Sequence, residues 1–154
     1  YSQIQHAGSL INLKKDSYGP IKDAGLWIKQ NSSPGEGILS ISITQTSYYT
    51  ERNVTSYSWM KTSDQFEQYL QNNRPKYLQI SIFEPHPSWI IQQGQNNEYS
   101  YIMLPYFNSS IATKNGNIAS LNLQREIKKG PAIFTLVYPQ NELNGVFVYH
   151  IKYD

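Results

Sequence analysis

The C-terminal end of the chain contains three runs rich in β-branched and aromatic residues, separated by residues that favour turns. These runs are Ile118–Ile127, Ala132–Tyr138 and Val146–Tyr153. Such side chains favour strands, and short breaks that contain glycine favour tight connections between neighbouring strands. A chain that ends in this way closes its core by pairing strands, so an antiparallel sheet is predicted in this region.

Alternation of apolar and polar residues predicts further strands upstream. Residues 39–44 place Leu or Ile at every second position, as in an antiparallel strand with one buried face. Tyr77–Phe83 alternates in the same way, and Gln79 and Ser81 are predicted to point away from the core. Gly25–Ile28 and Tyr99–Phe107 are further candidate strands, as is a short run from Leu10 to Leu13. Residues 48–59 fit either a strand or a long loop.

One short helix is predicted around residues 62–72. Thr62 is a suitable N-cap, and Gln65 stands three residues later as its partner in a capping box. Phe66 and Leu70 follow at a spacing that puts both on one face of a helix. A helix of this length is marginal alone in water, so we expect it to dock on a sheet.

Together these elements predict an all-β fold with one short helix. Many short strands with frequent turn signals are typical of an antiparallel β-sandwich, here of the C2-like or jelly-roll type. The length of 154 residues fits one such domain, over residues 1–154. Because the first residue is Tyr and not Met, the chain is interpreted as a processed form, a trimmed one or a module of a longer protein.

Composition excludes several classes of partner and site. The net charge is +2 and basic residues do not cluster, which argues against a nucleic-acid partner. No apolar run approaches the length of a transmembrane helix. The absence of cysteine removes disulfides, thiolate metal sites and cysteine nucleophiles. It fits a reducing compartment such as the cytoplasm, while an extracellular or cell-surface location stays open.

The sequence offers little that resembles a catalytic or metal site. His6, His86 and His150 are far apart and form no metal-binding spacing. His150 alternates with Phe147, Tyr149 and Ile151, so it is predicted to lie on the opposite face of the strand from them. Nucleophile-elbow and phosphate-binding motifs are absent, and acidic residues are scattered. We therefore predict no catalytic residue, no metal site, no cofactor and no enzymatic activity.

Aromatic residues give the main positive signal for function. Trp and Tyr are more abundant than a core of this size requires, and exposed aromatics beside Asn and Gln form protein hot spots or sugar platforms. The predicted binding residues lie in or near the least regular segments: Trp59, His86, Trp89, Tyr99 and Tyr101. The leading hypothesis is a non-catalytic module that binds a protein partner in a larger protein or assembly. The alternative is a secreted or surface carbohydrate-binding domain.

The C-terminal half also resembles a known family. Four consecutive segments are similar to the end of the calpain domain III, a C2-like β-sandwich. They are Arg125-Glu126-Ile127, the turn Lys128–Pro131, the run Ala132–Tyr138 with its following proline, and Gly145–Tyr149. Lys76–Ile82 resembles the preceding strand of that domain. The resemblance implies a non-catalytic module beside a protease or in a larger scaffold. The acidic loop linked to calcium in some members has no counterpart here.

Overall fold

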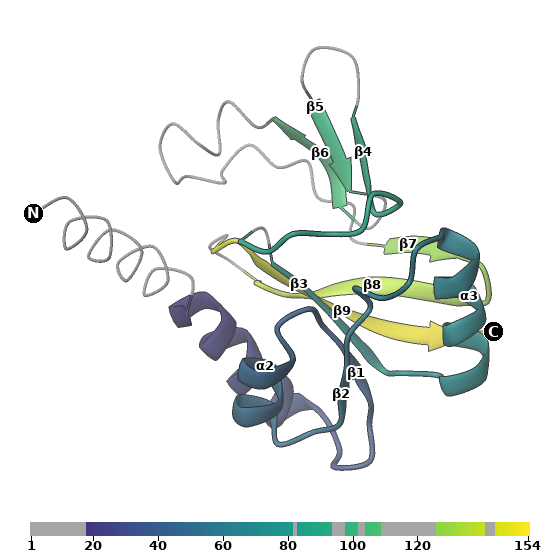
Figure 1. Cartoon of the computed structure of the whole chain (residues 1–154). Coiled ribbons are helices and arrows are strands. Elements are labelled where there is room, and N and C mark those ends of the chain that lie inside the picture. Colours follow the sequence, from purple (N-terminus) through teal and green to yellow (C-terminus); the bar gives the residue numbers. More distant parts are fainter. Residues whose placement is uncertain (1–17, 82, 94–97, 102–103, 109–125, 141–143) are drawn as a thin grey trace, which may run out of the picture.

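The computed structural model describes residues 18–81, 83–93, 98–101, 104–108, 126–140 and 144–154. Within these residues the chain forms three helices and two sheets (Figure 1). The helices span residues 18–31, Ile43–Thr50 (α2) and Ser63–Asn73 (α3). A six-stranded sheet forms the centre of the molecule, and a three-stranded sheet lies at one end of it.

The central sheet mixes parallel and antiparallel pairs. Its strands are β1 (Ile38–Leu39), β2 (Val54–Thr55), β3 (Tyr77–Ser81), β7 (Glu126–Lys129), β8 (Ala132–Tyr138) and β9 (Val146–Tyr153), in the order β2-β1-β3-β9-β8-β7. The pairs β1–β2 and β1–β3 are parallel, and the other three pairs are antiparallel. The small sheet is antiparallel and consists of β4 (Ile91–Gln93), β5 (Glu98–Tyr101) and β6 (Leu104–Asn108).

The all-β sandwich predicted from the sequence is therefore wrong. The described chain is about as rich in helix as in strand, and its main sheet is mixed. The prediction failed in the N-terminal half, where one segment assigned to a strand is helical and a second passes from a short strand into a helix. Parallel strands need a crossover connection, and α2 supplies one between β1 and β2.

The helix over residues 18–31 contains the predicted strand Gly25–Ile28. Ile21, Ala24 and Ile28 recur at the spacing of one helix face, and all three are buried. They pack against Ile38, Tyr77 and other residues on one face of the sheet. The local structure therefore follows the helical spacing of these buried residues, and the strand predicted from the short apolar run Gly25–Ile28 does not form.

The predicted strand over residues 39–44 ends after β1. Its alternation fits a strand, but Ile43 starts α2 and is largely exposed. Ser40, between the two elements, is fully buried and its hydroxyl lies 3.1 Å from that of Thr46 in α2. Most buried hydroxyls in proteins have a hydrogen-bond partner, and the turn of the chain into α2 brings one to Ser40.

The predicted helix and the C-terminal strands are confirmed. In α3 the Thr62 hydroxyl accepts a hydrogen bond from the Gln65 backbone N–H at 3.2 Å, as the capping signal indicates. The Gln65 side chain accepts from the backbone N–H of Lys61, one residue before the expected partner. The predicted runs Ala132–Tyr138 and Val146–Tyr153 are β8 and β9. Residues 118–125 of the third run lie outside the described residues, as do the candidate strand over residues 10–13 and residues 102 and 103 between β5 and β6.

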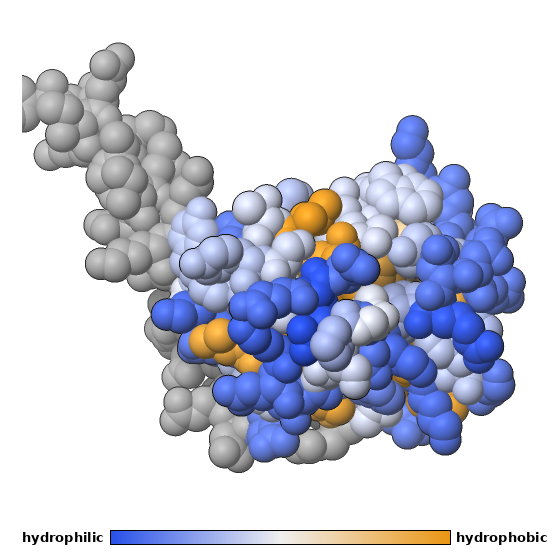
Figure 2. Space-filling model, turned by 90° about the horizontal axis from the view of Figure 1, so that it is seen from below, coloured by the Kyte–Doolittle hydropathy of each residue, from blue (hydrophilic) through white to orange (hydrophobic). Residues whose placement is uncertain are grey.

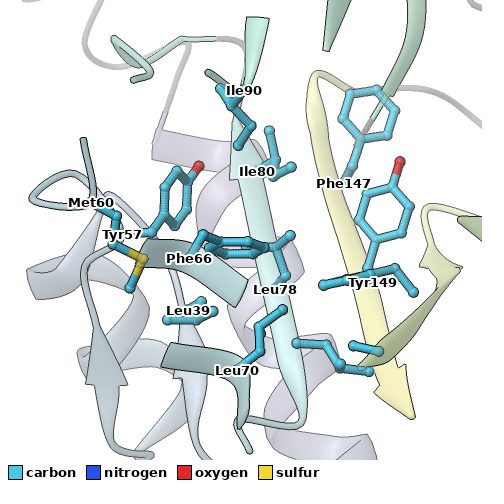
Figure 3. Packing of buried hydrophobic residues seen from close by; sticks show 13 residues of the cluster. Leu39, Tyr57, Met60, Phe66, Leu70, Leu78, Ile80, Ile90, Phe147 and Tyr149 are labelled. Carbon is cyan, nitrogen blue, oxygen red and sulfur yellow. The ribbon is translucent and has the colours of Figure 1, made fainter. Parts of the chain in front are cut away.

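The central sheet buries apolar side chains on both faces. Opposite residues of β3 and β9 share a face, and Leu78 with Tyr149 belongs to a cluster that Phe66 and Leu70 of α3 cover (Figure 3). Tyr77 lies opposite His150, on the face covered by the N-terminal helix. His150 thus points away from the rings of its own strand, which confirms the prediction for this residue.

Gln79 and Ser81 were predicted to face outward, and this prediction is wrong. Both are buried on the second face of the sheet. The Gln79 side-chain N–H donates to the Thr46 hydroxyl at 2.9 Å, so α2 satisfies part of its hydrogen-bonding capacity. Alternation correctly separates the two faces of β3 but does not reveal that helices cover both.

The crossing of the N-terminal helix and α2 depends on Gly25. A Cβ atom on Gly25 would lie 2.8 Å from Cβ of Tyr49, closer than two packed carbons tolerate. We expect Gly25→Ala to lower the free energy of unfolding by about 1–3 kcal/mol, since the helices must separate.

Gly19 of the same helix is the matched control, because a Cβ there would meet nothing within 4 Å. Gly19→Ala is expected to leave stability unchanged or to raise it by about 0.5–1 kcal/mol. Thermal unfolding followed by circular dichroism measures both. Equal melting temperatures for the two variants would contradict the close crossing.

Candidate interaction site

Trp59 stands at the apex of a turn whose flanking side chains are anchored in the core. Tyr57 and Met60 are fully buried, whereas the Trp59 side chain is 54% exposed. The backbone N–H of Met60 donates to the Tyr57 carbonyl, and the hydroxyl of Ser56 accepts from the backbone N–H of Ser58. The turn is therefore closed by its own hydrogen bonds and pinned on both sides, with the indole directed outward.

The Trp59 ring also rests on α3. Its centroid lies 6.1 Å from that of Tyr69, and the two rings meet edge to face at 76°. Tyr69 itself packs against the core cluster. Aromatic pairs in this geometry attract each other, so the exposed indole is held in one position.

His86 fastens the loop after β3 to the same turn. Its Nε2 lies 2.6 Å from the Ser81 carbonyl oxygen, which can only accept, so Nε2 carries the proton. Nδ1 then accepts from the Tyr57 hydroxyl at 3.1 Å, and the two rings stack. Burial lowers the pKa of His86, and the bond to the Ser81 carbonyl opposes this in part. Both ring nitrogens are thus engaged within the protein.

Trp89 completes the connection between the two segments. Its ring packs on Phe66 of α3 with a centroid separation of 4.9 Å. Its indole N–H donates to the backbone carbonyl of Met60. Trp89 is half-buried and acts as a support for the turn that presents Trp59.

The structure brings together three of the five predicted binding residues. Trp59, His86 and Trp89 all contact the turn at residues 57–60 or belong to it. Tyr99 and Tyr101 belong to β5, and their side chains lie outside the part of the structure that is described. Of the three, only Trp59 is largely exposed, so the candidate site centres on this residue.

A pocket of about 430 Å³ on the opposite face of the central sheet was not predicted. It lies between the end of the N-terminal helix and strands β3, β8 and β9. Its lining residues are Trp27, Asn31, Tyr77, Leu136, Val137, Pro139, Gln140 and His150. These residues are far apart in the sequence. The only signal in the sequence was the prediction that His150 lies on the opposite face of its strand from the core aromatic residues.

The described residues show neither a metal cluster nor a membrane-spanning helix. No group of three or more His, Cys, Asp or Glu side chains among them is placed to hold a metal ion. No helix among them is long and apolar enough to cross a membrane. Figure 2 shows one face of the molecule, which is mostly hydrophilic, with small and separate hydrophobic patches.

Comparisons with known proteins give no relative. No family model matches the sequence, and neither a curated protein nor a solved structure matches it significantly. The resemblance to calpain domain III is neither supported nor contradicted by them and stays a prediction.

Glu84 lies two residues before His86 in the chain, and its surroundings favour the protonated form of its carboxyl group. Burial raises the pKa of its carboxyl group to about 7 from an ordinary value of 4.5. The folded state therefore holds a proton that the unfolded state releases between these two values. The resulting contribution to stability is complete below pH 4.5 and is lost as the pH rises through about 7.

Glu84→Gln should remove this pH dependence, because an amide stays neutral. At pH 8 we expect the free energy of unfolding of the variant to exceed that of the wild type by about 1 kcal/mol, because solvent screens part of the effect at the partly exposed Glu84. Near pH 4.5 we expect the two proteins to be equally stable. Urea unfolding across this pH range measures the difference. Glu126→Gln, which alters an exposed carboxylate on β7, is the control. Parallel curves for the wild type and Glu84→Gln would show that Glu84 ionises normally.

Proposed function

We propose that the protein is a non-catalytic interaction module that binds a protein partner through Trp59. The observation that carries the proposal is the exposed indole at the apex of a turn with fully buried flanks. Trp is the residue type most enriched at binding hot spots. A side chain already fixed in position loses little conformational entropy when a partner covers it.

The support behind Trp59 favours this role over a purely structural one. A residue needed only for packing would be buried, as Tyr57 and Met60 are. Instead, Tyr69, Trp89 and His86 are the residues that fix the turn, and Trp59 extends beyond them. We infer that the partner offers an apolar depression of the size of an indole, surrounded by polar groups.

The state of His86 argues against catalysis at this position. A general base needs a ring nitrogen available to a substrate. Here Nε2 is bonded to the Ser81 carbonyl and Nδ1 to the Tyr57 hydroxyl. His86 therefore serves as a connector between two segments, which is consistent with a module that binds and does not react.

Replacing Trp59 with Ala should abolish most of the partner affinity and leave the fold intact. Loss of a hot-spot Trp costs about 2 kcal/mol or more, which corresponds to roughly thirtyfold in Kd. The variant's melting temperature should fall only slightly, because the Trp59 side chain is more than half exposed and loses one edge-to-face contact with Tyr69. To measure this, the wild-type and variant chains are immobilised and incubated with an extract of the source cells, and the amount of each protein that they retain is quantified.

Tyr48→Ala is the matched control, since Tyr48 is an even more exposed aromatic, at 76%, on α2. The proposal requires a protein that wild type and Tyr48→Ala retain equally and Trp59→Ala does not. Its binding is then measured by calorimetry with purified components. Proteins retained equally by all three chains, or by none, would reject the proposed site.

A further inference from the structure

The pocket on the second face of the sheet is built from rigid walls. The Tyr77 hydroxyl donates to the Asn31 backbone carbonyl at 2.7 Å, and the Tyr77 ring meets the His150 ring edge to face with centroids 5.3 Å apart. The Asn31 side-chain N–H donates to the Trp27 carbonyl at 2.8 Å. The Trp27 ring in turn packs on Tyr138. The pocket is thus largely preformed, as binding sites for small ligands usually are.

No charged side chain lines the pocket. The lining residues are aromatic, aliphatic or amide-bearing, and His150 is the only one that can titrate near neutral pH. Burial and the charge of Lys76 lower the pKa of His150, while Glu36 opposes them, so the imidazole is neutral at pH 7. The lining itself offers no counter-ion to a phosphate, carboxylate or ammonium group, and the nearby charges of Lys76 and Glu36 act on His150 in opposite directions. The desolvation of a charged ligand would therefore be poorly compensated. The walls therefore favour a neutral ligand.

The polar groups of the lining can donate and accept hydrogen bonds at the same time. An amide has two N–H donors and a carbonyl acceptor, and the bond from Asn31 to Trp27 uses only one donor. Gln140 is exposed at the rim. A neutral imidazole adds one donor and one acceptor. Such groups match hydroxyls, which also donate and accept, better than they match an apolar side chain.

The aromatic walls supply the other half of the recognition. A pyranose ring presents a face of C–H groups that packs on an aromatic ring, while its hydroxyls point outward around the edge. Trp27, which is partly exposed, offers the aromatic surface, whereas Tyr77 is only 5% exposed and forms the floor of the pocket. Asn31, Gln140 and His150 offer polar partners. A volume of about 430 Å³ lies at the lower end of the range for ligand pockets and suits one or two sugar units.

We propose that this pocket binds a neutral saccharide through a pyranose ring packed on Trp27 and hydrogen-bonded to Asn31, Gln140 and His150. The site is separate from Trp59, on the other face of the sheet. A nucleotide fits less well because its phosphates would lack cations. An aromatic side chain of a peptide fits less well because it would leave the amides and the imidazole without partners.

The test is a titration of the full chain with methyl β-D-glucopyranoside, N-acetylglucosamine and cellobiose, followed by calorimetry and saturation-transfer NMR, with a glycan array for other neutral sugars. At least one neutral sugar should bind with a Kd of about 1 mM or tighter. Gln140→Ala and His150→Ala should each weaken its binding about fivefold, through the loss of one hydrogen bond. Gln71→Ala, an exposed amide on α3, and Trp59→Ala should bind the sugar as the wild type does.

Three outcomes would overturn the proposal. The first is the absence of binding to any neutral sugar. The second is sugar binding that Gln140→Ala and His150→Ala leave unchanged, since the sugar would then bind elsewhere. The third is binding of glucuronate or of indole more tightly than every neutral sugar, which would indicate a charged or an apolar ligand. Gln140→Ala keeps the test decisive if His150→Ala destabilises the fold, because Gln140 is exposed.

Discussion

Burial of strands β3 and β9 on both faces is the constraint on which the rest of the structure depends. Every residue of β3 is buried, and so are five of the eight residues of β9. A strand covered on both sides needs a layer of side chains above and another below. The helix α3 supplies one layer, and the N-terminal helix with α2 supplies the other. Sites for ligands must therefore lie where these layers end.

The sequence reveals the elements whose side chains repeat regularly. β8, β9 and α3 could be predicted because a run of β-branched residues or a capping residue with helical spacing marks each of them. α2 could not, because its sequence is rich in Thr and Tyr and has no helical pattern of buried apolar residues. The N-terminal helix contains Ile21, Ala24 and Ile28 at helical spacing. The overlapping run Gly25–Ile28 resembles a strand, and this obscures the helical spacing.

Long-range packing explains why one site was predicted in part and the other was missed. Trp59, His86 and Trp89 come from two segments rich in aromatic residues, and their composition alone marks them as unusual. The pocket combines residues from the N-terminal helix, β3, β8 and β9, which are ordinary in their local context. Only the order of strands in the sheet brings them together, and that order includes parallel pairs that local alternation does not predict.

The alternation of side chains along β3 and β9 also separates the two proposed sites. Tyr77 and His150 point toward the pocket, whereas their neighbours Leu78 and Tyr149 belong to the core beneath the turn that carries Trp59. Each site thus takes its support from a different face of the same two strands. Hydrogen bonds from Tyr77 to Asn31 and from Asn31 to Trp27 already hold the walls of the pocket, so a ligand can fill it without a rearrangement of β3 or β9 that would reach the other face. Protein binding and saccharide binding are therefore expected to be thermodynamically independent in this molecule.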